Sequence, residues 1–299
     1  MQPGQPSRTA EYMALFRALE TVRPENRRLF SDPFARGFLR PSLRAAVRLA
    51  AFPALAPVLD WWVDRRRPGA RTSAIARTRL IDDLLDEAVA QGAGQAVILG
   101  AGFDCRALRL ACLGETRLFE VDHPATRAAK AAHLLGLEYP ANARFVEIDF
   151  NRQPLFEALA EAGLDAGQPT VFVCEGVTNY LSLEAVEAVL GGVGTFCPGT
   201  RIIFTYVDQG VLDGSVPFED AAEVVRHVAR LGEPWTFGLV PRQVDEFLRR
   251  WGLRLDSDLS AAEYRRRYFG PAAGGMKGYE FYHVAQAHVA KQELGVGGQ

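Results

Sequence analysis

The 299-residue chain has the composition of a folded globular protein, with 48% hydrophobic and 23% charged residues. This balance excludes disordered, collagen-like and fibrous proteins, and the formal net charge of −2 gives no general attraction to nucleic acid or anionic membranes. The charge is uneven, because residues 1–80 carry 15 basic and 6 acidic side chains, whereas residues 81–299 carry 19 and 30. The basic N-terminal segment is either a solvated helical face or a binding surface for acidic ligands.

Nothing in the sequence predicts a metal site, an export signal or a membrane span. The four cysteines show no C-x-x-C spacing, so we expect neither a zinc site nor a disulfide framework. The first ten residues lack the apolar core of a signal peptide, and the most apolar stretch, residues 45–63, is interrupted by charges and prolines. We therefore expect a cytoplasmic protein without a membrane or nucleic-acid partner.

From residue 7 to about residue 69 the sequence predicts short helices rather than strands. Apolar side chains recur at helical spacing within residues 12–19, and prolines then divide the chain into short pieces. Residues 65–69, Arg-Arg-Arg-Pro-Gly, are interpreted as a solvated charged connector. We expect a helical N-terminal cap over residues 1–72, followed by a main domain over residues 73–299.

The main domain starts with a long helix at about residues 73–90 and then alternates short apolar runs with helical stretches. Five runs have the length of buried strands: residues 96–99, 117–121, 144–148, 170–174 and 201–207. This alternation predicts βαβ units with right-handed crossovers. Two further strands are expected at residues 253–255 and 277–289. The predicted fold is therefore α/β and Rossmann-like, with a doubly wound, mostly parallel seven-stranded sheet and an antiparallel C-terminal edge strand.

The first strand runs into a glycine turn, Gly100-Ala101-Gly102. Glycines at this place let the chain turn sharply and bring backbone N–H groups close to a ligand, although a simple tight turn would look the same. Cys105 stands where the dinucleotide fingerprint has its third glycine, and the G-K-[ST] ending of a phosphate loop is absent. The sequence thus predicts a ligand pocket here, with little support for a diphosphate.

Carboxylates follow the next three strands. Asp122 has the distance in sequence from the glycines at which an acidic side chain usually binds ribose hydroxyls. Glu120 lies on the same face of the strand. The alternative role for Asp122 is to cap a helix. Asp149 with Phe150 could bind an adenine amine and ring, or could be a loop carboxylate beside a core phenylalanine. Glu175 follows the fourth strand. A ligand with a ribose and a cationic amine but no phosphate fits this set, and S-adenosylmethionine is such a ligand.

These residues resemble the leucine carboxyl methyltransferase family of S-adenosylmethionine-dependent enzymes, especially its bacterial branch. Four segments carry the resemblance: ARTRLIDD at residues 76–83, VILGAGFDCR at 97–106, EVDHP at 120–124 and EGVTNYL at 175–181. It extends over about residues 7–291 and implies a class I methyltransferase fold with S-adenosyl-L-methionine as the cofactor. It also implies a place in secondary metabolism, since members of this branch methylate polyketide carboxylates.

The resemblance further implies roles for individual residues. Around the cofactor it places Arg77 at the carboxylate, Gly100 and Gly102 near the methionine part, Asp122 at the ribose, Asp149 with Phe150 at the adenine, and Glu175 near the amino group. Asp104 is a further expected cofactor-binding residue. Arg77 has the alternative of a solvated helix arginine, because Arg79 lies close by. The sequence departs from the family at Cys105, where the branch has threonine, but a small residue is retained.

Methyl transfer from a sulfonium requires alignment and exclusion of water more than acid–base chemistry. A carboxylate acceptor would need only a cationic clamp, whereas a phenol or alcohol would need a base, for which His123, His227 and Tyr180 are candidates. Tyr180 and Tyr206 are the expected catalytic residues lining the acceptor pocket, although either could simply fill the core at its rim.

We expect O-methylation of a carboxylate or acidic hydroxyl on a small molecule held beneath the basic cap. Candidate clamps are Arg17, Arg71 and the run 265–267, each of which could also be an ordinary surface residue. One alternative is an NAD-dependent oxidoreductase, but the third glycine is missing and no lysine lies four residues after a tyrosine. The other is a non-catalytic S-adenosylmethionine-binding protein, which would show the same sequence features.

Overall fold

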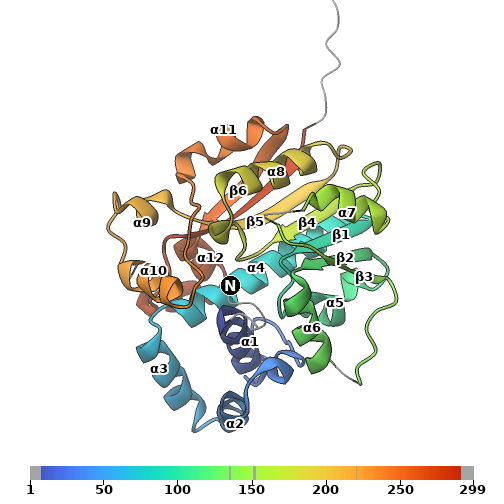
Figure 1. Cartoon of the computed structure of the whole chain (residues 1–299). Coiled ribbons are helices and arrows are strands. Elements are labelled where there is room, and N and C mark those ends of the chain that lie inside the picture. Colours follow the sequence, from blue (N-terminus) through green and yellow to red (C-terminus); the bar gives the residue numbers. More distant parts are fainter. Residues whose placement is uncertain (1–7, 135, 151–152, 220, 291–299) are drawn as a thin grey trace, which may run out of the picture.

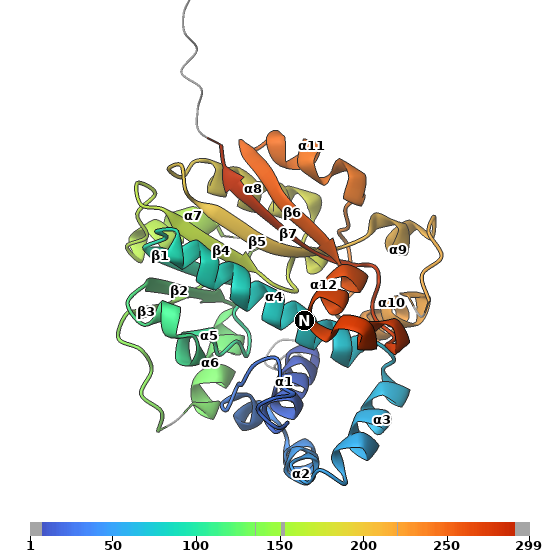
Figure 2. The same ribbon diagram turned by 180° about the vertical axis from the view of Figure 1, so that it is seen from behind.

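The computed structural model describes residues 8–134, 136–150, 153–219 and 221–290, and within them seven strands form one mixed sheet (Figure 1, Figure 2). The strands are β1 (Gln95–Leu99), β2 (Arg117–Asp122), β3 (Ala143–Glu147), β4 (Thr170–Cys174), β5 (Arg201–Val207), β6 (Leu253–Ser260) and β7 (Tyr282–Val289). Their order is β3-β2-β1-β4-β5-β7-β6, and β1 to β5 are parallel to one another. The predicted α/β fold with a mostly parallel sheet is confirmed.

The prediction that the last strand lies at the edge of the sheet is wrong. β7 is antiparallel, as expected, but it lies between β5 and β6, so β6 forms the edge. All residues of β7 except its two histidines are buried, as suits a strand with neighbours on both sides. The partly exposed β6 instead carries Arg254, Asp256 and Asp258, and charged side chains are typical of edge strands.

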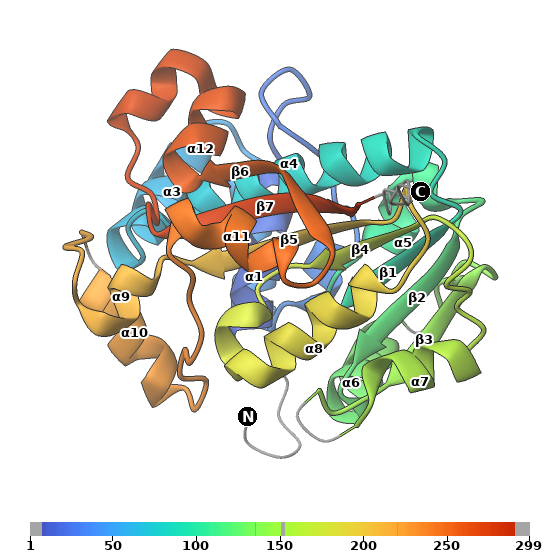
Figure 3. The ribbon, with the colours of Figure 1, turned by 90° about the horizontal axis from the view of Figure 1, so that it is seen from above.

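Helices cover both faces of the sheet (Figure 3). The helices are α1 (Arg8–Thr21), α2 (Pro41–Ala50), α3 (Ala56–Arg66), α4 (Ala70–Ala90), α5 (Arg106–Arg109), α6 (Pro124–His133), α7 (Leu155–Glu161), α8 (Leu183–Gly194), α9 (Gln209–Asp213), α10 (Ala221–Arg230), α11 (Val244–Arg249) and α12 (Ala261–Phe269). Apolar residues of α7, α8 and α11 pack on one face around Phe172 and Phe204. Residues of α4 and α12, including Leu80 and Tyr264, pack on the other.

The first three helices form the expected helical segment beside the sheet, in the lower part of Figure 1. A proline lies in the first turn of α2 and of α3, where its missing N–H has no partner to lose. The helix that follows, α4, begins at Ala70 rather than at the predicted Ser73. Gly69 precedes it with φ +77, and the backbone of Gly278 leaves no room there for a Cβ. The ring of Phe103, after the glycine turn, stacks on Phe38 of the cap at 4.6 Å.

Candidate active site

A cavity of about 740 Å³ lies at the carboxyl ends of the parallel strands. Its walls come from the turns after β1, β2, β3 and β4, from α1, α4 and α10, and from the residues that precede β7. Open α/β sheets bind ligands at this edge, and protein ligand pockets measure about 300–1,000 Å³. All eight expected cofactor-binding residues line it: Arg77, Gly100, Gly102, Asp104, Asp122, Asp149, Phe150 and Glu175.

The glycine turn forms the floor of the cavity. Gly100 has φ +63 and Gly102 has φ +46, a left-handed conformation that side chains other than glycine rarely adopt. A Cβ on Gly100 would also collide with a methyl group of Val177. The turn therefore places backbone at the wall of the cavity, and at Gly100 it leaves no room for a side chain.

Asp122, rather than Glu120, reaches the cavity from β2. Its two carboxylate oxygens accept hydrogen bonds from the backbone N–H groups of Gly102 and of His123, the latter at 2.6 Å. Burial raises the pKa of Asp122, and these hydrogen bonds oppose the rise. Glu120 instead accepts hydrogen bonds from Lys130 Nζ at 2.6 Å and from Tyr139 Oη at 2.5 Å, outside the cavity.

His123, a candidate base, caps α6, where its Nδ1 accepts a hydrogen bond from the backbone N–H of Ala125 at 3.2 Å. Its ring therefore has a structural role at the start of the helix. Asp122 does not cap this helix, because the N-cap residue is His123.

Glu175 is held between two arginines. Its Oε1 accepts a hydrogen bond from Arg77 Nε at 2.9 Å, and its Oε2 accepts one from Arg106 Nη2 at 2.8 Å. Although burial acts to raise it, the pKa of Glu175 lies below its ordinary value because of the charges on Arg106 and Arg77. A half-buried carboxylate is thus kept ionised at the wall of the cavity.

Arg77 is not a solvated helix arginine, because it is only 8% exposed. Its neighbour Arg79 is the surface residue and pairs with Asp83 at 2.8 Å. On the opposite side of the sheet edge, Asp149 and Phe150 line the cavity after β3, and the backbone N–H of Asp149 donates to Gln153 Oε1 at 2.8 Å.

Sequence analysis did not predict the burial of Arg106, which is 1% exposed. Besides Glu175, it contacts Asp104 and Asp82, the latter at 2.7 Å. It belongs to a series of buried ion pairs that we call the ion-pair chain, in the order Arg17, Asp32, Arg109, Asp82, Arg106, Glu175 and Arg77. The charge of Arg106 helps to lower the pKa of Asp104 to about 2, against the effect of burial.

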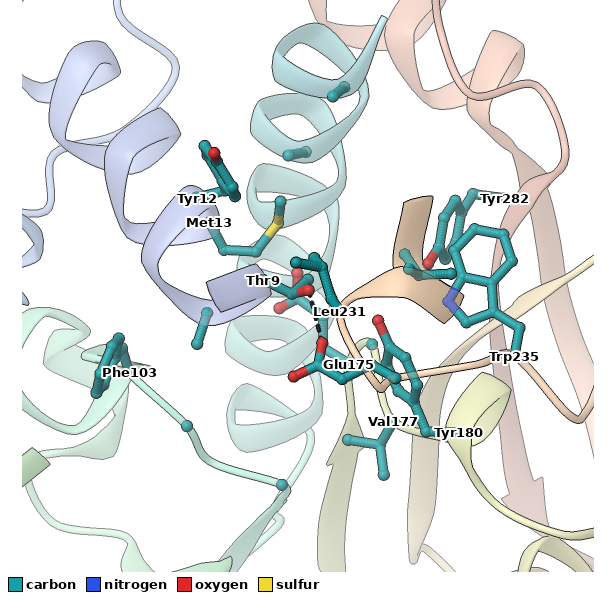
Figure 4. A pocket seen from close by; sticks show the side chains of 18 of the residues that line it. Thr9, Tyr12, Met13, Phe103, Glu175, Val177, Tyr180, Leu231, Trp235 and Tyr282 are labelled. Carbon is teal, nitrogen blue, oxygen red and sulfur yellow. Dashed lines mark hydrogen bonds between the residues drawn. The ribbon is translucent and has the colours of Figure 1, made fainter. Parts of the chain in front are cut away.

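Aromatic side chains line one part of the cavity, which we call its outer half (Figure 4). Tyr180, Trp235 and Tyr282 lie on one side, and Tyr12 with Met13 from α1 lies on the other. The cavity therefore contains two regions of different chemistry, one lined by carboxylates and backbone amides and the other by rings.

Tyr180 lines the cavity, as predicted. Its phenol lies beside the side chains of Trp235, Thr9 and Asn179, and burial raises its pKa. Such a phenol is a poor base at neutral pH, so Tyr180 is better suited to contact an acceptor than to remove its proton.

The prediction that Tyr206 lines the acceptor pocket is wrong. Its side chain is fully buried on the face of the sheet covered by α8 and α11, and its hydroxyl donates to Asp258 Oδ2 at 2.6 Å. The Tyr206 ring also stacks on His283 of β7 at 4.9 Å. Because side chains alternate along a strand, the sequence places Tyr206 correctly at the end of β5 but does not show which face it occupies.

Of the arginines considered as acceptor clamps, only Arg17 reaches the cavity. It donates to Asp32 at 2.8 Å and to the carbonyl of Phe103 at 2.5 Å, so its charge is already neutralised. Arg71 pairs with Asp64, and none of residues 265–267 lines the cavity.

Arg67 lines the cavity instead, so the expectation of a solvated connector at residues 65–69 is wrong for this residue. Its Nη2 lies 3.0 Å from His227 Nε2, and its guanidinium lies 4.0 Å from the centre of the Tyr12 ring. No sequence signal distinguishes Arg67 from the two arginines before it, because its environment is made by α1 and α10.

Across the described ranges, no cluster of histidine, cysteine and acidic side chains is suited to hold a metal ion. Within the same residues, no helix combines the length and apolar character needed to cross a membrane.

The family model for leucine carboxyl methyltransferase matches residues 10–194. A Streptomyces coelicolor protein named "putative S-adenosyl-L-methionine-dependent methyltransferase" is 38% identical over 224 residues, covering 73% of this chain and 76% of the relative. A Frankia alni protein with the same description is 34% identical over 273 residues, covering 89% and 91%. A Thermobifida fusca structure, described as a "putative methyltransferase", has a TM-score of 0.61 at 15% identity and 97% coverage of both chains, which shows the shared fold.

These matches remove the NAD-dependent oxidoreductase as an interpretation of the glycine turn. The cavity also contains an acid beside an arginine, a glycine turn in which Gly100 has no room for a Cβ, and a carboxylate at the end of β2. The chain therefore belongs to the leucine carboxyl methyltransferase family and is an S-adenosyl-L-methionine-dependent methyltransferase.

Proposed function

We propose that the enzyme methylates an oxygen atom of a small acidic acceptor, either a carboxylate or an acidic hydroxyl, with polyketide acids as the class suggested by the sequence resemblance. When bound, S-adenosyl-L-methionine supplies a methyl group on a cationic sulfur, and the acceptor oxygen forms its bond to that carbon as the carbon–sulfur bond breaks and the electron pair returns to sulfur. A carboxylate acceptor has no proton to lose, whereas a hydroxyl must release one.

The arrangement of Arg77 and Glu175 is the observation that supports the cofactor site on which the proposal rests. Two groups of opposite charge, 2.9 Å apart and both lining the cavity, match the ammonium and carboxylate of an amino acid. We assign Glu175 to the ammonium and Arg77 to the carboxylate of the cofactor. The amino-acid end would then lie between β4 and α4, and the sulfur near the glycine turn.

The remaining cofactor contacts follow from the order of the strands. Asp122 after β2 would accept hydrogen bonds from the ribose hydroxyls, and Asp149 with Phe150 after β3 would receive the adenine. Asp104 lines the cavity next to Gly102, but its carboxylate holds Arg106 through both the backbone N–H, at 2.6 Å, and the side chain. Its proposed role is therefore to position Arg106 and, through it, Glu175.

The walls of the outer half exclude water and position the acceptor. Tyr180 and Trp235 stand next to the turn that carries Glu175 (Figure 4), so an acceptor between the rings would face the methyl group. Alignment of this kind can supply a large part of the rate enhancement of a displacement reaction.

Two measurements test the proposal. Calorimetric titration should show binding of S-adenosylmethionine and S-adenosylhomocysteine but not of NAD. Transfer from methyl-labelled cofactor should then be measured against matched carboxylic acids, phenols, amines and thiols. Transfer to oxygen acceptors supports the proposal, transfer only to nitrogen or sulfur contradicts it, and cofactor binding without transfer to any panel member would favour a non-catalytic binding protein.

A further inference from the structure

The cavity contains one half-buried cation whose charge no carboxylate neutralises within the described residues. The cationic side chains at its wall are Arg17, Arg66, Arg67 and Arg77. Arg17 pairs with Asp32 and Arg77 with Glu175, and Arg66 is exposed, with its guanidinium over the Trp62 ring. Arg67 contacts the His227 imidazole and the Tyr12 ring.

The surroundings of Arg67 hold its guanidinium in place without supplying a negative charge. His227 belongs to α10 and Tyr12 to α1, so two elements fix the orientation of this side chain. Burial lowers the pKa of His227, as do the charges of Arg67 and Arg230, while exposed Glu223 acts in the opposite direction. The imidazole is therefore neutral at neutral pH. Glu233, the other acid on this wall, accepts a hydrogen bond from the Thr9 hydroxyl at 2.8 Å.

Arg67 lies far from the proposed cofactor amino acid. It comes three residues before Ala70, the first residue of α4, whereas Arg77 is seven residues into the same helix. At 1.5 Å per residue the backbone positions of Ala70 and Arg77 are separated by about 10 Å. The contacts of the two guanidinium groups also differ, because Arg67 lies against Tyr12 and His227, whereas Arg77 contacts Glu175 and Met13. A group bound to Arg67 would thus be remote from the amino-acid end of the cofactor.

Rings line the cavity at both ends, because Tyr12 lies against Arg67 and Tyr282 lies near Arg77. Tyr180, Trp235 and Tyr282 form one wall, and Tyr12 lies across from them (Figure 4). Aromatic walls favour flat ring systems through offset or edge contacts. Arg67 and the aromatic walls together therefore indicate the chemistry of the whole acceptor molecule, and not only of the group that is methylated.

We propose that the acceptor is an aromatic compound with an anionic group separate from the oxygen that is methylated, and that Arg67 binds this anion at the outer end of the cavity. The inference rests on the proposed function and narrows its substrate class. Arg67 is then a specificity-determining residue, and His227 is a positioning residue that orients it. Guanidinium groups bind carboxylates through paired, charge-assisted hydrogen bonds.

A binding experiment separates this inference from the transfer reaction. Protein saturated with S-adenosylhomocysteine is titrated with a hydroxynaphthoate and with its neutral carboxamide. Wild type should bind the acid roughly tenfold or more tightly than the amide, the effect of a charge-assisted hydrogen bond. Arg67→Gln should remove this preference, and Arg67→Lys should keep part of it. The control Arg48→Gln removes an exposed charge on α2 outside the cavity and should behave as wild type.

The affinity for S-adenosylhomocysteine shows in each variant whether the fold and the cofactor site are intact. The inference is overturned if wild type binds the amide as well as the acid, if it binds neither compound, or if Arg67→Gln keeps the preference. Failure of the proposed function would differ, because the acid would then bind but receive no methyl group on oxygen.

Dependence on pH provides a readout that a purely structural contact would not change. A bound anion favours the protonated imidazole, so the affinity for the acid should rise as the pH falls from about 7.5 to 5.5. The affinity for the amide should stay constant, and His227→Gln should abolish the rise for the acid. A flat profile in wild type would contradict the assignment of His227.

Discussion

Asp122 and Glu120 lie two residues apart on β2, and only their partners distinguish them. The carboxylate of Glu120 accepts hydrogen bonds from Lys130 and Tyr139, while Asp122 faces the cavity. Spacing from the glycines favours Asp122, but the sequence does not show that Glu120 is already paired. Its partners lie 10 and 19 residues further along the chain, and nothing local fixes that contact.

Replacing Asp122 tests its contact with the ribose. Asp122→Ala should weaken cofactor binding by about 1.5–3 kcal/mol, because charge-assisted hydrogen bonds are lost. Calorimetric titration with S-adenosylhomocysteine measures the change. The control is Glu147→Ala at the end of β3, where the carboxylate pairs with Arg127 at the surface and does not line the cavity. Wild-type affinity in Asp122→Ala would remove this residue from the site.

Glu175 allows a sharper test, because its proposed contact is with the amino-acid part of the cofactor, and the test can include a ligand that lacks this part. Glu175→Gln removes the negative charge proposed to face the ammonium, so the affinity for S-adenosylhomocysteine should fall roughly tenfold or more. The affinity for 5′-methylthioadenosine, which lacks the amino acid, should change little. Equal losses for the two ligands would mean that the substitution disturbs the whole site.

A strand of this sheet can be predicted from the sequence when it is a continuous apolar run buried on both faces. β1, β4 and β5 are apolar runs buried on both faces, and their sequences identify them. The order of β6 and β7 is harder to predict, because adjacency in a sheet is a long-range property. The alternating pattern of β7 indicates an antiparallel strand but does not show that β6 would cover its second side.

The glycine turn between β1 and α5 predicts a difference between two similar substitutions. Gly100→Ala combines a left-handed backbone with a collision against Val177, whereas Gly92→Ala has a similar backbone, φ +102, in open space. Backbone strain should destabilise both by about 1–2 kcal/mol, and the collision with Val177 should add to the loss in Gly100→Ala, as urea unfolding would show. Only Gly100→Ala should also reduce cofactor affinity. Loss of cofactor affinity in both variants would mean that strain alone explains the effect.

For the molecule as a whole, the ion-pair chain is the feature least accessible to sequence analysis. Arg106 and Arg77 look like ordinary helix arginines, yet their partner Glu175 lies 69 and 98 residues away. Hydrophobic patterns predict cores, but buried charges follow no period. The fold, and the fact that the eight expected residues line one cavity, were therefore largely predictable, whereas Arg67, Arg106 and the aromatic wall were not.

Removing one member of the ion-pair chain should be costly. Arg106→Met leaves Asp82, Asp104 and Glu175 without their shared cation, so the free energy of unfolding should fall by about 3–5 kcal/mol. The control Arg79→Met breaks a half-exposed pair with Asp83, and its effect should be below about 1 kcal/mol. Urea unfolding measures both. Similar effects of the two substitutions would show that the buried pairs contribute no more than a surface pair.

The ion-pair chain also limits how the enzyme can be redesigned. Arg17 and Asp32 come from the N-terminal helical segment, while Arg109 and Asp82 belong to the body that carries the proposed cofactor residues. An engineer who grafts the helical segment of a relative onto this protein, in order to change the acceptor, would separate counter-ions that now share one buried network. Such chimeras should succeed only when both halves of that network are transplanted together.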